Sequence, residues 1–116
     1  MHAQATDEIT HPDRGEIELA EVLHALSDPI RLRIVAELAR SEGSPTCGSF
    51  DVPVSKSTCT HHFRVLREAG ITLTRPEGTH RYVSLRREEL DERFPGLLDA
   101  VLAAAEREAA YSTPAS

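Results

Sequence analysis

The feature of the sequence that most restricts the fold is a predicted helix over residues 55–69. Residues typical of a β-hairpin follow it directly. Ser55 can cap the first helical turn with its hydroxyl, and Gly70 can end the helix in the left-handed conformation that glycine adopts without strain. The apolar face of the segment repeats at helical spacing, at Cys59, Phe63 and Leu66. A capped helix that leads into a hairpin restricts the chain to folds in which a helix lies beside a small sheet.

Three other segments predict helices from the spacing of their apolar residues. The first covers residues 17–26 and the last covers residues 97–105. The second begins after Asp28, because a carboxylate there can cap a helix and Pro29 suits the first helical position. Short helical turns are expected at residues 46–54 and 86–93.

Strand character appears twice after Gly70. Residues 71–73 and 82–85 are predicted strands, and the Arg-Pro-Glu-Gly-Thr run at residues 75–79 predicts the turn between them. The order of elements is therefore helix, helix, short turn, capped helix, hairpin, helix. This order predicts a mainly α fold with a small β-hairpin, the winged helix-turn-helix.

Length and composition agree with one small helical domain. The chain has 116 residues, with three Phe, two Tyr and no Trp, so its core must be aliphatic. We expect a flexible N-terminal arm over residues 1–14, the domain over residues 15–111, and a tail over residues 112–116. No apolar run approaches the roughly 18 residues of a membrane span, and residues 1–10 lack the apolar stretch of a signal peptide. Two cysteines without an export signal predict reduced thiols and a cytoplasmic protein.

The net charge of −6 hides a basic segment. Residues 55–87 hold seven basic residues against two acidic ones, a net charge of +5, so the rest of the chain carries −11. Binding to phosphates needs a local basic face rather than a basic protein. The basic residues of this segment are Lys56, Arg64, Arg67, Arg75, Arg81, Arg86 and Arg87.

Two motifs resemble those of the ArsR/SmtB-type repressors, a family of winged helix-turn-helix proteins. Leu26 to Ile34 is similar to the L-x-D-P-x-R-L-x-I opening of that family. Ser55 to Ile71 is similar to its recognition helix, S-x-S-T-V-S-x-H-L-x-x-L-x-x-A-G-L. The resemblance spans about residues 16–110; Cys59 and Phe63 replace aliphatic residues of the family pattern, and both still suit a buried face.

The resemblance implies that the helix over residues 55–69 enters the major groove of DNA. Short hydroxyl side chains near its start would approach base edges, His61 would face DNA, and His62 would pack or hydrogen-bond inside. Arg64 would reach a phosphate or guanine, and the hairpin tip would contact the DNA backbone. The expected DNA-binding residues are Ser55, Lys56, Ser57, Thr58, Thr60, His61, Arg64, Arg75, His80 and Arg81.

The resemblance also implies a two-fold homodimer that joins the first and last helices. In this sequence both helices carry more apolar surface than one small fold needs. The expected interface residues are Leu19, Leu23, Leu98, Val101, Leu102 and Ala105. A symmetric dimer predicts an inverted-repeat operator, and the family predicts a repressor.

The metal sites common in that family do not transfer to this sequence. Cys47 is a single thiol where such relatives have Cys-x-Cys, and the last helix has carboxylates but neither His nor Cys. We therefore expect no metal or other cofactor. Cys47 and Cys59 are a candidate redox pair, although free cysteines more often serve as small buried hydrophobes. His2 and His11 would supply ligands only if the arm folded back.

Two other classes of function compete with a DNA-binding regulator. An enzyme is disfavoured, because no cysteine or histidine lies in a glycine-rich or strand-turn-helix context that would activate it. A winged-helix protein-interaction module would not need the basic bias between Lys56 and Arg87. A thiol- or metal-responsive sensor with an unusual effector site stays open. The expected partners are double-stranded DNA and a second copy of the chain, without a membrane.

Overall fold

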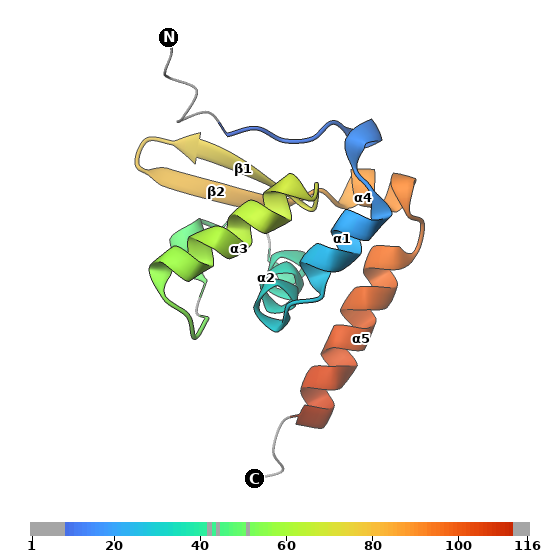
Figure 1. Ribbon diagram of the computed structural model, residues 1–116. Coiled ribbons are helices and arrows are strands. Elements are labelled where there is room, and N and C mark those ends of the chain that lie inside the picture. The colour runs from blue at the N-terminus through green and yellow to red at the C-terminus, as the bar shows by residue number, and fades with distance from the viewer. Residues whose placement is uncertain (1–8, 42, 44, 51, 113–116) are drawn as a thin grey trace.

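The computed structural model describes residues 9–41, 43, 45–50 and 52–112. Figure 1 shows helices α1 to α3 gathered beside a two-stranded hairpin, with α5 projecting away from it. The fold is the expected mainly helical winged helix-turn-helix. Its elements are η2 (Arg14–Glu16), α1 (Leu19–Leu26), α2 (Pro29–Arg40), η3 (Cys47–Ser49), α3 (Lys56–Glu68), β1 (Thr72–Glu77), β2 (His80–Leu85), α4 (Arg87–Arg93) and α5 (Leu97–Ser112). None of the helices within the described residues is long and apolar enough to span a membrane.

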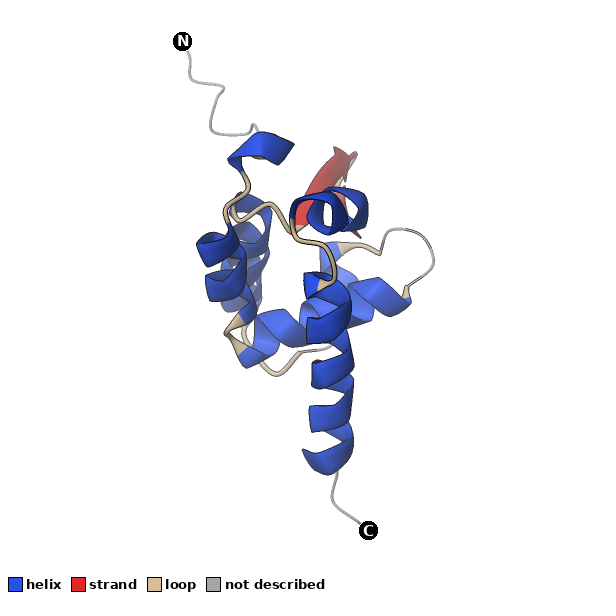
Figure 2. Ribbon diagram, turned by 90° about the vertical axis from the view of Figure 1, so that its right-hand side faces the viewer, coloured by secondary structure: helices blue, strands red, loops and turns tan. Residues whose placement is uncertain are grey.

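The apolar stripes of the helices meet in one aliphatic core. Ile34 and Val35 of α2 are fully buried, as are Leu66 of α3 and Val83 of β2. Fully burying a side chain of this size contributes about 1.5–3 kcal/mol to folding. The core therefore holds α3 and the hairpin against the first two helices. Figure 2 shows this arrangement of helices and hairpin turned by 90° from Figure 1.

The predicted helix ends are confirmed where local chemistry sets them. Asp28 accepts hydrogen bonds from the backbone N–H groups of Ile30 and Arg31, at 2.9 and 3.1 Å. Ser55 caps α3 by accepting from the N–H of Thr58 at 3.2 Å. Gly70 follows α3 with φ +89°, a conformation that suits glycine, and a Cβ there would lie 2.5 Å from the side chain of Ile17.

The hairpin is longer than predicted, and its turn is shorter. The strands continue to Glu77 and from His80, so the turn is only Gly78-Thr79, with Gly78 at φ +64°. The prediction that residues 75–79 form the turn is wrong, because Pro76 lies inside β1 opposite Arg81. A two-stranded sheet has only edge strands, where a residue without an N–H can be accommodated.

The described part of the N-terminal arm lies against the domain. Nε2 of His11 accepts a hydrogen bond from the N–H of Thr74 at 3.0 Å, and the carbonyl of Pro12 accepts one from Arg86 at 2.8 Å. Residues 1–8 of the expected arm, including His2, lie outside the described residues, as do residues 113–116 of the expected tail. Helix α5 reaches Ser112, one residue past the expected domain boundary.

Candidate nucleic-acid interface

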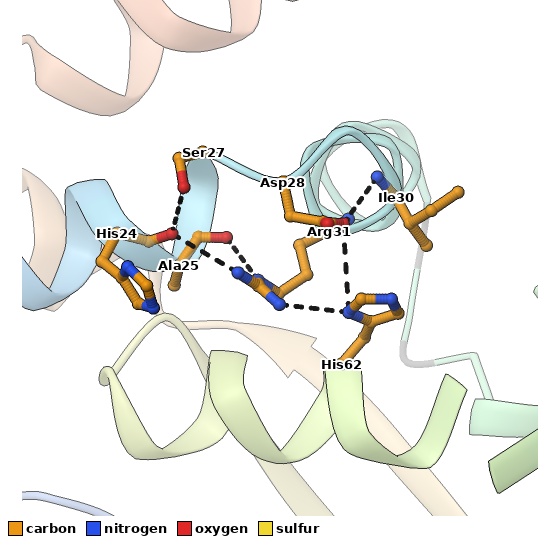
Figure 3. A network of polar contacts seen from close by, with 7 residues as sticks. All are labelled: His24, Ala25, Ser27, Asp28, Ile30, Arg31 and His62. Carbon is orange, nitrogen blue, oxygen red and sulfur yellow. Dashed lines mark hydrogen bonds and ion pairs between the residues drawn. The ribbon is translucent and has the colours of Figure 1, made fainter. Parts of the chain in front are cut away.

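A buried polar network attaches α3 to the junction of α1 and α2 (Figure 3). Nη1 of Arg31 lies 3.1 Å from Nδ1 of His62, and Nε of Arg31 donates to the carbonyl of Ala25 at 2.7 Å. A carboxylate oxygen of Asp28 lies 3.9 Å from the same Nδ1. Since both Arg31 and His62 are buried, this network fixes how far and at what angle α3 stands from the other helices. The expectation that His62 has an internal hydrogen-bonding part is confirmed.

The opposite face of α3 is exposed and polar. Its cap is internally bonded: the hydroxyl of Ser55 donates to that of Thr58 at 2.9 Å. The hydroxyl of Thr60 donates to the carbonyl of Lys56 at 3.0 Å, which leaves its oxygen able to accept. The exposed residues of this face are Lys56, Ser57, Thr58, Thr60, His61 and Arg64. The structure therefore brings together the helical residues that the sequence predicted.

The wing residues differ in how they are held. The guanidinium of Arg75 lies over the ring of Tyr82, 5.1 Å from its centre, and 4.0 Å from a carboxylate oxygen of Glu77. His80 is exposed beside the same ring, at 6.1 Å between centroids. Arg81 is exposed and, within the described residues, has neither a hydrogen bond nor an ion pair. Arg81 is therefore the wing cation most available to an outside anion.

The basic face is smaller than the residue count of the segment implies. Arg86 is buried, and its guanidinium donates hydrogen bonds to the carbonyl of Pro12 and to a carboxylate oxygen of Glu89, at 2.8 and 3.2 Å. Arg87 donates to a carboxylate oxygen of Asp99 at 2.9 Å. Both arginines therefore serve internal contacts: Arg86 joins the arm to α4, and Arg87 joins α4 to α5. These two arginines count toward the basic charge of residues 55–87, but neither was among the expected DNA-binding residues, and neither is free to join a basic face.

Four cations of the segment keep their charge unpaired. Within the described residues no hydrogen bond or ion pair involves the side chains of Lys56, Arg64, Arg67 or Arg81. Arg67 is half-buried on the inner side of α3, and its Nε is buried without a hydrogen-bond partner. Sequence reasoning counted Arg67 only as one charge among seven. Its inward placement depends on how the wing packs against α3, which no local pattern encodes.

The two cysteines are free thiols, and both are half-buried. Burial raises the pKa of the Cys59 thiol, and burial likewise raises that of Cys47, although the charge of Arg81 opposes the shift. Both groups therefore stay protonated near neutral pH and are weak nucleophiles. No cluster of three or more His, Cys, Asp or Glu able to hold a metal occurs within the described ranges.

The residues expected at a dimer interface divide into three groups by their exposure. Leu19 and Leu23, four residues apart on one side of α1, are 45% and 46% exposed and form an exposed apolar pair. Leu98 of α5 is only 3% exposed and belongs to the core of its own chain, so little of it is left for a partner. The remaining three expected residues, Val101, Leu102 and Ala105, are half-buried on α5.

Known proteins are similar to this chain over the helix-turn-helix region. A family model described as a helix-turn-helix domain matches residues 26–75, which include α2 and α3. The HTH-type transcriptional regulator YceK of Bacillus subtilis is 38% identical over 84 residues, covering 71% of this chain and 84% of that protein. A transcriptional repressor SmtB homolog of Synechocystis is 34% identical over 82 residues, covering 71% of this chain and 61% of that protein.

Solved structures agree with these sequence relatives. The ArsR-like transcriptional regulator from Rhodococcus sp. RHA1 superposes with a TM-score of 0.54 at 29% identity, covering 78% of this chain and 92% of that one. Such regulators bind DNA and are not enzymes. The capped helix, the wing and these relatives together show that the chain belongs to the ArsR/SmtB family of helix-turn-helix transcriptional regulators.

Proposed function

We propose that this regulator is a repressor that binds an inverted-repeat operator as a homodimer. The observation that carries the proposal is the exposed face of α3, where Thr60, His61 and Arg64 stand beside unpaired Lys56. A helix that presents short hydroxyl, imidazole and guanidinium groups can hydrogen-bond base edges in the major groove. The N-terminus of α3 adds a partial positive charge that favours a phosphate.

The wing would hold this helix in register. The side chain of Arg81 is exposed on β2, has no partner among the described residues, and can contact the phosphate backbone. Such contacts position a protein on the duplex without reading its sequence. Arg75 would contribute less, because the ring of Tyr82 and the carboxylate of Glu77 already hold it.

Dimerisation would pair the exposed apolar surface of α1 with that of α5. Leu19 and Leu23 expose nearly half of their surface, and Val101 and Leu102 are only half-buried. Figure 1 shows the C-terminal part of α5 projecting beyond the other helices, where a second copy can pack along it. An operator read by such a dimer would have half-sites about one turn of DNA apart, roughly 34 Å.

The test is a DNA titration by fluorescence anisotropy, using the DNA upstream of the protein's own gene and a scrambled duplex of equal length. We expect tighter binding to the upstream DNA, and affinity for both that falls steeply with salt. Light scattering on the same sample should give the mass of a dimer. Equal affinity for both duplexes at every salt concentration, or a monomer mass at micromolar protein, would contradict the proposal.

A further inference from the structure

A cavity of about 720 Å³ lies between α3, the η3 turn, the hairpin and the start of the described arm. Its apolar side includes Phe50, Val52 and Phe63, and the rings of Phe50 and Phe63 meet edge to face at 5.3 Å between centroids. A cavity of this size is within the range that holds a small organic ligand.

The polar side of this cavity is positively charged. Lys56, Arg64, Arg67 and Arg81 all line it, and these are the four cations of residues 55–87 whose side chains make no hydrogen bond or ion pair within the described residues. None of the described residues that line the cavity carries a carboxylate. Among the described residues, the cavity therefore combines four cations without carboxylate partners and an aromatic wall.

Arg67, which lines the cavity, has a buried donor that no described residue satisfies. Its Nε is buried without a hydrogen-bond partner, whereas nearly all buried polar atoms in proteins are paired. Leaving such a group unsatisfied costs free energy that an anionic acceptor would recover. The pKa of nearby His11 is lowered by burial and by the charges of Arg67 and Arg86, which agrees with a positive potential here.

We propose that this cavity binds a small aromatic carboxylate or sulfonate, and that its occupant competes with DNA for Arg64 and Arg81. The acid group would bind Arg67 and the rim arginines, and the ring would pack against Phe50 and Phe63. The competition rests on the proposed function, because Arg64 and Arg81 are assigned there to DNA. The ligand would then act as an inducer that releases the regulator from its operator.

A DNA phosphate alone does not account for this cavity. A phosphodiester needs exposed cations, and Arg64 and Arg81 at the rim already provide them. A phosphodiester would not contact the edge-to-face pair of phenylalanines or the half-buried Arg67 on the inner side of α3. A flat anion with an apolar body uses both features.

The test uses anilinonaphthalene sulfonate, a fluorescent aromatic sulfonate, with the full-length protein. We expect saturable binding that naphthoate displaces and that inorganic phosphate at the same concentration does not. Arg67→Gln should weaken binding about tenfold, the effect expected for one lost charge-assisted hydrogen bond. Arg67→Lys should retain much of the affinity, and Arg40→Gln, an equal charge change at an exposed position of α2, should have no effect.

The same probe should raise the apparent Kd for DNA of the wild-type protein, and should raise it much less for Arg67→Gln. Unaltered probe binding by folded Arg67→Gln, equal displacement by phosphate, or unchanged DNA affinity at saturating probe would each overturn the proposal. Urea unfolding of each variant confirms that it is folded. Failure of the two proposals is distinguishable: probe binding that depends on Arg67 without any DNA binding would contradict the function but not the cavity's ligand.

Discussion

Arg31 and His62 meet in the interior although they are 31 positions apart, with Nη1 of the guanidinium 3.1 Å from Nδ1 of the imidazole. Because arginine can only donate, Nδ1 of His62 must accept, and the ring proton of the neutral side chain lies on Nε2. The same guanidinium also bonds the carbonyl of Ala25, so the pair joins α1, α2 and α3 at one point. The orientation of α3 relative to α1 and α2 therefore depends in part on this contact.

Replacing His62 by Ala should therefore destabilise the protein by about 1–3 kcal/mol, because a buried guanidinium loses one acceptor. The matched control is His61→Ala on the adjacent exposed position, which should change stability by less than about 0.5 kcal/mol. Urea unfolding followed by circular dichroism measures both. Equal stability of the two variants would show that the Arg31 contact contributes little.

The sequence predicted those features that neighbouring residues determine. The Asp28 and Ser55 caps and the end of α3 at Gly70 need only local chemistry, and all three were found where expected. Arg86 shows the limit: it follows a strand and precedes charged residues, so its sequence looks exposed, yet α4 and the arm enclose it. Arg31 is buried for a similar long-range reason.

The site was predictable to the same extent. The helical period alone separates the exposed Thr60 and His61 from the buried Phe63, so the exposed face of α3 follows from the sequence. Which arginines remain available could not be predicted, since that depends on partners far along the chain, such as Asp99 for Arg87. The cavity beside Arg67 depends likewise on the packing of the wing against α3.

Stability should depend on pH through His11. Burial, together with the charges of Arg67 and Arg86, lowers the pKa of His11 below its ordinary value of about 6.5. His11 therefore binds a proton more readily in the unfolded chain than in the folded protein. The contribution of neutral His11 to the free energy of unfolding is complete above about pH 6.5 and is lost as the pH falls below that value. His11→Gln keeps an acceptor for the N–H of Thr74 but cannot titrate. Between pH 7.5 and 5.5 the wild type should lose more stability than this variant; parallel urea-unfolding profiles would argue against the assignment.

The dimer can be tested without disturbing the core. Val101 and Leu102 pack partly on the core, so a glutamate there would split the dimer but would also strain the monomer. Leu23→Glu is cleaner, since Leu23 is 46% exposed in the single chain. A charge buried in an apolar interface is costly, so this variant should be a folded monomer with weakened operator binding. Thr79→Glu, an equal charge change in the hairpin turn, should stay dimeric; a dimeric Leu23→Glu by light scattering would place the interface elsewhere.

Arg81 tests the role of the wing. Arg81→Ala should weaken binding to operator and to random DNA by the same factor, because a backbone contact carries no sequence information. It should also lower the slope of log affinity against log salt by about one unit, since one fewer phosphate is neutralised. Arg75→Ala should change the slope less, because Glu77 and Tyr82 already engage Arg75. A selective loss of operator binding in Arg81→Ala would instead mean that the wing reads bases.

The reading face of α3 is tested most directly by the double variant Thr60→Ala, His61→Ala. Both side chains are exposed, and Thr60 bonds only the carbonyl of Lys56 within the helix, so the fold should be retained. Each lost base contact should cost about 1–3 kcal/mol of operator affinity, with little change for random DNA and an unchanged salt slope. That pattern is the opposite of the one expected for Arg81→Ala, and anisotropy titrations on both duplexes at several salt concentrations separate them. If the double variant bound the operator as tightly and as selectively as the wild type, bases would be read by some other surface, and the exposed face of α3 would have no part in specificity.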